Sequence, residues 1–168
     1  MNVPVRPDIG YIPTPEAMVL TALAFAQVQP QDVVYDLGCG DGRVLVLAAQ
    51  QFGVKGVGVE LQPELVARAQ AGAIAAGVSD RLRFIQGNLF AQNLSAASVV
   101  FLYLLPHLNL RLRSRLLQQL QPGSRIVSRD FDMGADWPPE RTCRVLADEE
   151  AATLYYWRVP SPEERESD

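Results

Sequence analysis

The sequence predicts an α/β fold: a three-layer α/β/α sandwich whose mostly parallel, seven-stranded sheet closes in an antiparallel hairpin. Three observations lead to this prediction. Short apolar segments alternate with segments of helical periodicity along most of the chain, and this alternation is typical of parallel strands joined by crossover helices. Three glycines follow the first strand-like segment. The last two strand-like segments are separated by too few residues for a crossover helix between them.

The first half of the chain is predicted to contain three helices and two strands. In order they are a helix at 14–27, a strand at 33–37, a helix at 44–51, a strand at 54–60 and a helix at 63–77. Thr14 is expected to cap the first helix, and Pro15 suits a first helical position. Pro63 opens the third helix in the same way, and Gly77 is the type of residue favoured just past a helix end.

The second half of the chain is predicted to contain five strands and one helix. In order they are strands at 82–86 and 98–104, a helix at 108–121, a strand at 125–131, and strands at 142–147 and 153–159. The helix is amphipathic because four leucines share one face. They are Leu108, Leu112, Leu116 and Leu120. The last two strands are joined by the short sequence DEEAA, which suits an antiparallel hairpin.

Composition predicts one domain at 1–160 and an acidic, disordered tail at 161–168. The 168 residues are 48% hydrophobic, and the net charge is −4. The last eight residues hold four acids and one arginine, so they contribute −3 and leave the body nearly neutral. This balance disfavours a nucleic-acid partner. The densest basic set, Arg111, Arg113 and Arg115, is expected to be a solvated helix face.

Cysteine usage and hydropathy predict a cytoplasmic protein. Cys39 and Cys143 are the two cysteines, and their spacing matches no zinc or redox motif, as is typical of a reducing compartment. The longest apolar stretch, at 99–106, is too short for insertion in a membrane. No exposed heptad pattern is present, so a monomer is expected.

The glycines mark a ligand-binding turn. Gly38, Gly40 and Gly42 follow the first strand, with Asp36 and Asp41 beside them. Ligands of open parallel sheets bind beyond the carboxyl ends of the strands, where the first strand turns into its helix. Glycines there permit positive φ and let a ligand lie against the backbone. A tight turn without a ligand explains neither the number of glycines nor the flanking acids.

The spacing of the glycines distinguishes between ligands. A dinucleotide-binding turn has its third glycine six positions into the motif, and that position is Arg43 here. Residues 36–42 follow the pattern D-x-G-x-G-x-G, which resembles motif I of the class I, seven-strand S-adenosylmethionine-dependent methyltransferases. The resemblance implies a Rossmann-like fold, S-adenosyl-L-methionine as cofactor, and methyl transfer by direct in-line displacement that requires no metal.

The resemblance also implies a set of cofactor-binding residues. They are Tyr11, Thr14, Asp36, Gly38, Cys39, Gly40, Glu60, Leu61, Asn88, Leu89 and Tyr103. Glu60 ends the second strand, where a carboxylate can accept both hydroxyl hydrogens of a ribose. Asn88 stands where the family commonly has an aspartate for adenine. Leu61 and Leu89 suit either a purine wall or ordinary core, Cys39 is small enough for the turn, and GYIPTP, which contains Tyr11 and Thr14, resembles a segment that folds over the cofactor.

The acceptor side is less specific. Tyr103 lies at the end of the fourth strand, where many family members place an acceptor-contacting residue, and simple core packing is the alternative. Asp130 and Asp132 follow the fifth strand, and one is expected to face the cleft while the other caps the loop. Tyr103 and Asp130 are the candidate catalytic residues. His107 suits a helix start or packing better than general base catalysis, because nothing in the sequence pairs it with a second catalytic group.

Several motifs along the chain, among them GVELQP, GNLF, VVFLYLLPHLN and TLYYWRVP, make it similar to bacterial relatives of the ATP synthase subunit c lysine methyltransferase. The resemblance implies a methyl-acceptor substrate that includes protein lysine, and a small-molecule acceptor is the alternative. A catalytically silent S-adenosylmethionine-binding module fits the same motifs. A nicotinamide-dependent oxidoreductase is disfavoured by Arg43 and by the lack of a substrate domain.

Overall fold

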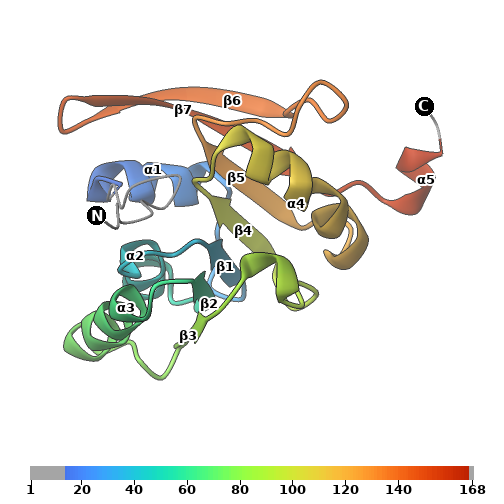
Figure 1. Ribbon diagram of the computed structural model, residues 1–168. Helices are drawn as coiled ribbons and strands as arrows, with labels where there is room; N and C mark the ends of the chain where they lie inside the picture. Colours follow the sequence, from blue (N-terminus) through green and yellow to red (C-terminus); the bar gives the residue numbers. More distant parts are fainter. Residues whose placement is uncertain (1–13, 167–168) are drawn as a thin grey trace, which may run out of the picture.

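The computed structural model describes residues 14–166, and they contain one seven-stranded sheet with helices on both faces (Figure 1). The strands are β1 (Val33–Leu37), β2 (Lys55–Glu60), β3 (Leu82–Gln86), β4 (Val99–Leu102), β5 (Arg125–Arg129), β6 (Arg141–Ala147) and β7 (Glu150–Arg158). The helices are α1 (Glu16–Phe25), α2 (Arg43–Phe52), α3 (Pro63–Ala75), α4 (Pro106–Gln119) and α5 (Pro162–Arg165), with a 3₁₀ turn η1 (Leu89–Ala91).

The sheet has the strand order β3-β2-β1-β4-β5-β7-β6. The first five strands in sequence pair in parallel, whereas β7 runs antiparallel to both β5 and β6. The predicted α/β class and its closing hairpin are therefore confirmed. The order reverses between β1 and β4, and the carboxyl ends of the five parallel strands share one edge of the sheet, the edge at which ligands bind in open α/β sheets.

The core lies in two layers, one on each face of the sheet. Alternate residues of β1 serve both layers, since Val34 belongs to the layer under α1 and α2, and Tyr35 to the layer under α4. Leu23 and Leu45 enter the first layer, and Leu112 enters the second. Figure 1 shows α1, α2 and α3 on one side of the sheet and α4 on the other. Burial on both faces explains why β4 is a continuous apolar run and why β1 is apolar except for Asp36.

The start of α1 differs from the expectation. The helix begins at Glu16, and Pro15 occupies the N-cap position without a side-chain hydrogen bond. Thr14 does not cap the helix because its buried hydroxyl accepts a hydrogen bond of 3.1 Å from the Arg129 guanidinium. The local sequence favoured a helix cap, but Arg129, which is distant in the sequence, donates to the hydroxyl oxygen of Thr14 instead.

The hairpin also differs from the expectation. The strands extend to Ala147 and from Glu150, so the connection is a two-residue turn at Asp148 and Glu149 instead of five residues. Both turn residues have positive φ, 50° and 65°. A turn with two left-handed residues matches the twist of antiparallel strands, and it lets Ala151 pair with Leu146.

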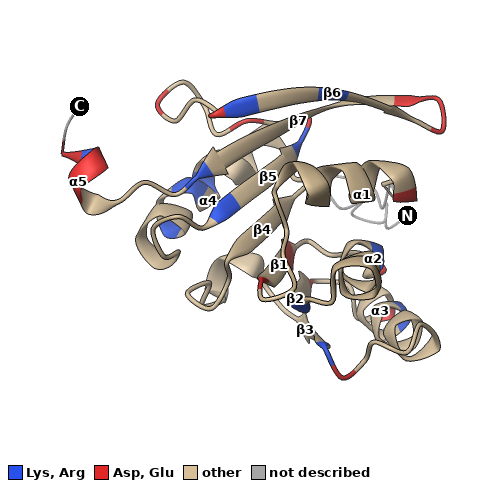
Figure 2. Cartoon of the chain, turned by 180° about the vertical axis from the view of Figure 1, so that it is seen from behind, with Lys and Arg blue, Asp and Glu red and all other residues tan. Residues whose placement is uncertain are grey.

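The C-terminal residues form a short helix where an acidic, disordered tail was expected. Ser161 caps α5 by accepting from the backbone of Glu164 at 3.3 Å, and Arg165 donates to the carbonyl of Leu117 at 2.5 Å. Figure 2 shows acidic residues on α5 and at the β6–β7 turn, and basic residues around α4. Within residues 14–166, no helix combines the length and the apolar character needed to cross a membrane.

The arginines of α4 are not a purely solvated face. The Arg111 guanidinium lies 4.0 Å from the centre of the Phe90 ring, and Arg113 donates to the carbonyl of Met133 at 3.0 Å. Arg115 donates to the carbonyl of Gln92 at 3.0 Å. Helical spacing placed these residues on the helix surface, but their long side chains reach the loops on either side of α4.

Candidate active site

The glycine turn between β1 and α2 lies at the carboxyl edge of the sheet. Gly38, Gly40 and Gly42 all have positive φ, at 84°, 55° and 81°, the conformation that the sequence predicted for them. A Cβ at Gly42 would lie 2.8 Å from the Cβ of Ala69. Gly42 is therefore required for close packing of the turn on α3, which is a reason separate from ligand binding.

Glu60, at the end of β2, holds the glycine turn in place. One carboxylate oxygen accepts from the backbone N–H of Gly40 at 3.0 Å, and the other accepts from the N–H of Gln62 at 3.0 Å. The structure thus brings together two positions that the sequence proposed separately. Because each carboxylate oxygen has two lone pairs, Glu60 keeps acceptor capacity for hydroxyl hydrogens.

Asp36, at the end region of β1, is a buried carboxyl with an unusual pKa. Asp36 is only 3% exposed. Burial, and then the nearby charges of Glu60 and Asp41, raise the pKa of Asp36 from 3.8 to about 8. At neutral pH this carboxyl is therefore mostly protonated and can donate a hydrogen bond, which a charged aspartate cannot.

Cys39 is a packing residue of the turn. Its thiol donates to the carbonyl of Gly40 at 3.9 Å, and a Cβ at Gly58 would lie 2.7 Å from its sulfur. Burial, together with the charges of Asp36 and Glu60, raises the pKa of the thiol. The thiol is therefore unreactive at neutral pH, and its small size lets the turn lie against β2.

The ends of β2 and β3 carry the residues predicted for a purine. Leu61 is 67% exposed, so it is not a core residue, whereas Leu89 is half-buried and packs against the core layer under α4. The Asn88 side-chain oxygen accepts from the N–H of Phe90 at 2.9 Å. That oxygen keeps a second lone pair for an amine hydrogen, and the amide nitrogen of Asn88 can donate to a ring nitrogen.

Tyr103 lies in a cluster that joins four elements at the same edge. The Arg129 guanidinium sits 4.4 Å from the centre of the Tyr103 ring, and the Phe131 ring stacks on Tyr103 at 6.4 Å between centroids. Arg129 is 4% exposed, donates to Thr14, and pairs with Glu150 at 3.0 Å. Sequence reasoning missed Arg129, because an arginine inside a strand-like run gives no signal of its burial.

The two acids after β5 have different contacts. Asp130 adopts a φ of 65°, accepts from the N–H of Thr153 at 3.0 Å with one oxygen, and lies 3.5 Å from the Arg129 Nε with the other. Asp132 accepts from the N–H of Gly134 at 3.0 Å and so caps its own loop. His107 is exposed in the first turn of α4, and Tyr11 lies outside the described residues.

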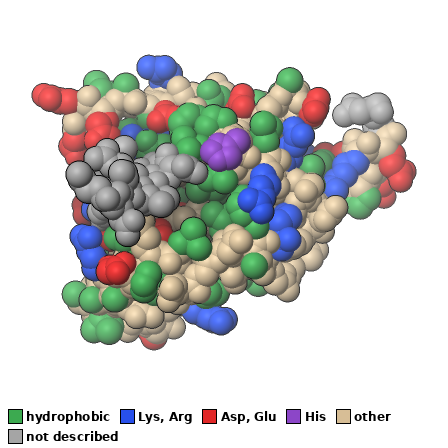
Figure 3. Space-filling view, in the orientation of Figure 1, with side chains coloured by type: hydrophobic (Ala, Val, Ile, Leu, Met, Phe, Trp, Pro, Cys, Tyr) green, Lys and Arg blue, Asp and Glu red, His purple; other side chains and the backbone are tan. Residues whose placement is uncertain are grey.

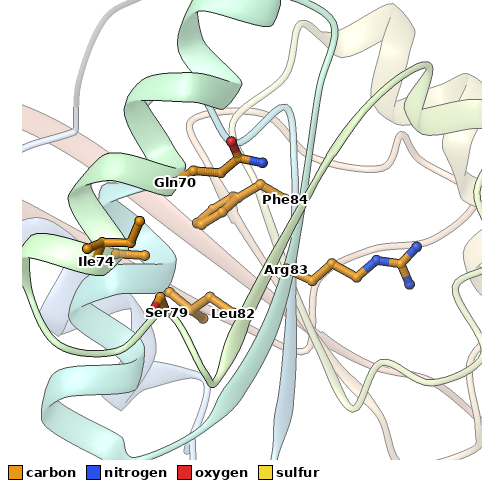
Figure 4. A pocket seen from close by; sticks show the side chains of 7 residues that line it. Gln70, Ile74, Ser79, Leu82, Arg83 and Phe84 are labelled. Atoms are coloured by element: carbon orange, nitrogen blue, oxygen red, sulfur yellow. The ribbon is translucent and has the colours of Figure 1, made fainter.

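The surface also carries a pocket and an apolar patch. A pocket of about 380 Å³ between α3 and β3 is lined by Gln70, Ile74, Leu82 and Phe84 (Figure 4). It lies on the flank of the sheet, where Phe84 also borders the glycine turn, since a Cβ at Gly42 would lie 3.0 Å from its ring. The lining supplies no cluster of acids. Figure 3 shows hydrophobic side chains gathered around the chain's single histidine, on the face that carries α4.

The site fits an adenosine-bearing cofactor. The turn presents backbone beside the buried carboxyl of Asp36, Glu60 retains acceptor capacity, and Leu61 exposes apolar surface next to it. A purine and a ribose need these three features: an apolar face, a carboxylate acceptor and a close approach to backbone. Within residues 14–166, no group of His, Cys, Asp and Glu side chains is placed to hold a metal ion.

Comparisons with known proteins agree with this site. The model of the ANTKMT methyltransferase domain matches residues 36–141, which is more than half of the chain. A protein-lysine N-methyltransferase of Saccharolobus islandicus is 40% identical over 154 residues, covering 91% of this chain and 95% of the relative. An adenine nucleotide translocase lysine N-methyltransferase of Mus musculus is 34% identical, covering 87% of this chain and 65% of the relative.

A solved structure extends the comparison. A crystal structure described as an RNA methyltransferase from Salinibacter ruber, in complex with S-adenosyl-L-homocysteine, superposes with a TM-score of 0.83. It is 47% identical and covers 89% of this chain and 95% of its own. S-adenosylhomocysteine is the demethylated form of the cofactor that the glycine turn predicted. The chain therefore belongs to the ANTKMT methyltransferase domain family and is an S-adenosylmethionine-dependent methyltransferase.

Proposed function

We propose that this methyltransferase transfers a methyl group to the side-chain amine of lysine in a protein. The observation that carries the proposal is the relative from Saccharolobus islandicus, which is named a protein-lysine N-methyltransferase and is similar over 91% of this chain. The local charge supports it. Asp130 and Glu150 lie on either side of Arg129, so the cluster beside Tyr103 is net negative and favours a cationic acceptor.

The cofactor is assigned to the residues around the glycine turn. Asp36, Gly38, Cys39 and Gly40 lie against it, Glu60 accepts from the ribose, and Asn88 donates to the purine. Apolar contacts to the purine come from Leu61 and Leu89. Its methionine portion is assigned to Tyr11, Thr14 and Tyr103. When bound, S-adenosylmethionine supplies a methyl group that is already activated for attack by an amine.

The remaining task of the chain is to orient the amine and to favour its neutral form, whose proton is lost to solvent water. A lysine ammonium has an ordinary pKa of about 10.4, which a low-polarity slot lowers. The stacked rings of Tyr103 and Phe131 supply apolar surface at the carboxyl edge for one wall of such a slot. Tyr103 is the better candidate to receive a hydrogen bond from the amine, because both oxygens of Asp130 already contact Thr153 and Arg129.

RNA is the second candidate acceptor, because the solved structure at 47% identity is described as an RNA methyltransferase. The chain's charge favours protein over RNA. Its net charge is −4 and its body is nearly neutral, with three arginines of α4 as the densest basic set. A polyanion gains little on such a surface.

The test is an acceptor assay with labelled S-adenosylmethionine. The purified protein is incubated with a bacterial protein extract or with total RNA, and the products are treated with protease or with ribonuclease. We expect label that protease releases and that mass spectrometry locates on lysine. Label that only ribonuclease releases would overturn the lysine proposal, and no transfer to either despite cofactor binding would favour the small-molecule or silent alternatives.

Domain organisation, assembly and location belong to the same proposal. We assign one methyltransferase domain to residues 1–160, a monomeric state and a cytoplasmic location. The single continuous sheet of the described residues and the absence of a spanning helix among them support these assignments. Light scattering of the purified protein tests the monomer, and a mass of two or more chains would reject it.

A further inference from the structure

Three successive backbone carbonyls after β5 accept hydrogen bonds from side chains of α4. The amide nitrogen of Asn109 donates to the carbonyls of Phe131 and Asp132, at 3.2 Å each, and Arg113 donates to the carbonyl of Met133 at 3.0 Å. Residues 109 and 113 are four apart, so they share one face of the helix. Figure 1 shows α4 lying beside β5 along this contact.

A serine of β5 completes the contact from the other side. The Ser128 hydroxyl donates to the carbonyl of Phe131 at 2.7 Å and accepts from the amide nitrogen of Asn109 at 3.3 Å. Both residues are fully buried. The carbonyl of Phe131 is thus held by two side chains that come from different elements, which fixes the direction in which the chain leaves β5.

Asn109 is an unusual choice for a buried helix position. Its side-chain oxygen has no hydrogen-bond partner among the described residues, and a buried acceptor without a partner is unfavourable. A leucine of similar size would avoid this cost. We therefore explain the presence of asparagine at position 109 by the hydrogen bonds of its amide nitrogen to the segment after β5, and not by a contribution to the stability of the core.

The segment that Asn109 and Ser128 hold carries Phe131. It begins at Asp130, whose φ is 65°, and the next residue stacks its ring on Tyr103 with an interplanar angle of 20°. The segment then passes close to α4, since a Cβ at Gly134 would lie 2.7 Å from a methyl carbon of Leu110. The position of the Phe131 ring depends on these contacts because Phe131 itself lies in no strand or helix.

We propose that Asn109 and Ser128 are positioning residues for the methyl acceptor. They hold residues 131–133 against α4, so that Phe131 stays stacked on Tyr103 and forms one wall of the acceptor slot. The inference rests on the proposed function, because it takes the acceptor to enter beside Tyr103. Neither residue contacts the glycine turn or Glu60, so cofactor binding is expected to be independent of both.

The experiment compares two variants with two controls. Asn109→Leu removes the donors at similar volume, and Ser128→Ala removes the hydroxyl. Leu116→Ala, two turns further along α4, lowers stability in the core layer that also contains Met133 but removes no hydrogen bond to residues 131–133. Ser114→Ala changes an exposed residue of the same helix. For each protein, calorimetry gives the Kd for S-adenosylmethionine, and steady-state assays give kcat and KM for an acetylated Gly-Lys-Gly amide peptide.

We expect Asn109→Leu and Ser128→Ala to raise the acceptor KM about tenfold, the scale on which small misplacements act, with the cofactor Kd and kcat within about twofold. The controls keep the wild-type KM. If the cofactor Kd changes as much as KM, or if Leu116→Ala gives the same KM change, the positioning role is wrong. If the wild-type protein methylates RNA and not the peptide, the lysine proposal fails, and the same KM comparison on RNA decides the role of Asn109.

Discussion

Glu60 shows how one side chain can serve both the fold and the ligand. Its carboxylate holds the N–H groups of Gly40 and Gln62 at 3.0 Å each, and the same group is the proposed ribose acceptor. Two substitutions at Glu60 are expected to separate the structural role from the ligand-binding role. The glutamine variant keeps an oxygen for Gly40 but loses the charge, whereas the alanine variant loses both.

Replacing Glu60 by alanine is predicted to weaken S-adenosylmethionine binding by about 1–3 kcal/mol, the range for hydrogen bonds to a charged group. Glu60→Gln should fall between alanine and wild type. Calorimetric titration measures both Kd values, and Glu64→Ala, an exposed acid in the first turn of α3, is the control. A folded Glu60→Ala protein with the wild-type Kd would reject the ribose role.

Asp36 makes the stability of the free protein depend on pH. Its pKa is raised from 3.8 to about 8 in the folded chain, so between these values the folded state binds one more proton than the unfolded state. The free energy of unfolding therefore falls as pH rises through this window, by up to about 1.4 kcal/mol per pH unit. The loss ends once the pH exceeds the folded pKa.

Asp36→Asn is predicted to remove this slope, because an amide does not titrate. The variant should gain stability relative to wild type between pH 5 and pH 8, as measured by urea unfolding of the cofactor-free protein at each pH. Asp80→Asn, at an exposed position, should follow the wild-type curve. Parallel curves for wild type and Asp36→Asn would mean that Asp36 is ionised throughout.

At the scale of elements, α2 has glycines at both ends that differ in their surroundings. Gly42 at its N-cap and Gly53 at its C-cap have similar φ values, 81° and 72°. A Cβ at Gly42 would lie 2.8 Å from Ala69, whereas one at Gly53 would meet nothing within 4 Å. The two positions therefore separate the cost of backbone strain from the cost of crowding.

Gly53→Ala is predicted to lower the free energy of unfolding by about 1 kcal/mol through its positive φ alone. Gly42→Ala should lose a further 1–3 kcal/mol or so, because the methyl group pushes α3 away from the turn. Guanidinium unfolding measures both values. Equal losses at the two positions would show that α3 moves freely and that Gly42 is not a packing requirement.

At the scale of the whole molecule, the two edges of the sheet have different tasks. At the edge formed by the amino ends of the parallel strands, Asp32 is 5% exposed and pairs with Arg125. Its carboxylate also accepts from the Ser98 hydroxyl and the Gln29 N–H, at 2.7 Å each. This cluster ties the strand starts of β1, β4 and β5 together. The described residues that are proposed for the cofactor lie at the opposite, carboxyl edge.

Asp32→Ala is predicted to lower the free energy of unfolding by about 3–5 kcal/mol, because it leaves the half-buried Arg125 guanidinium without its carboxylate. The Kd for S-adenosylmethionine, measured below the unfolding transition, should stay within about twofold of wild type. Asp80→Ala serves as the exposed control. A large loss of cofactor affinity in the folded Asp32 variant would show that the two edges are coupled.

The order of the elements and the identity of the cofactor followed from local patterns in the sequence. The strands at 33–37 and 82–86 have the predicted bounds, because their apolar runs end at clear turn residues. The positive φ of the glycine turn was also predictable, since glycine is the residue that adopts it without strain. Strand ends at β4 and β5 came out shorter than expected. After β5, Asn109 of α4 holds the carbonyls of Phe131 and Asp132 and so sets the chain direction.

The sequence by itself determined the α/β class, the glycine turn and the family, since each depends on residues close together in the chain. Only the tertiary structure decided that Arg129 lies buried between Thr14 and Tyr103, 115 residues away from the first. It also decided that Asp36 holds its proton near neutral pH. The burial and the charge state of a side chain depend on neighbours from distant segments of the chain, so a local sequence pattern does not predict them.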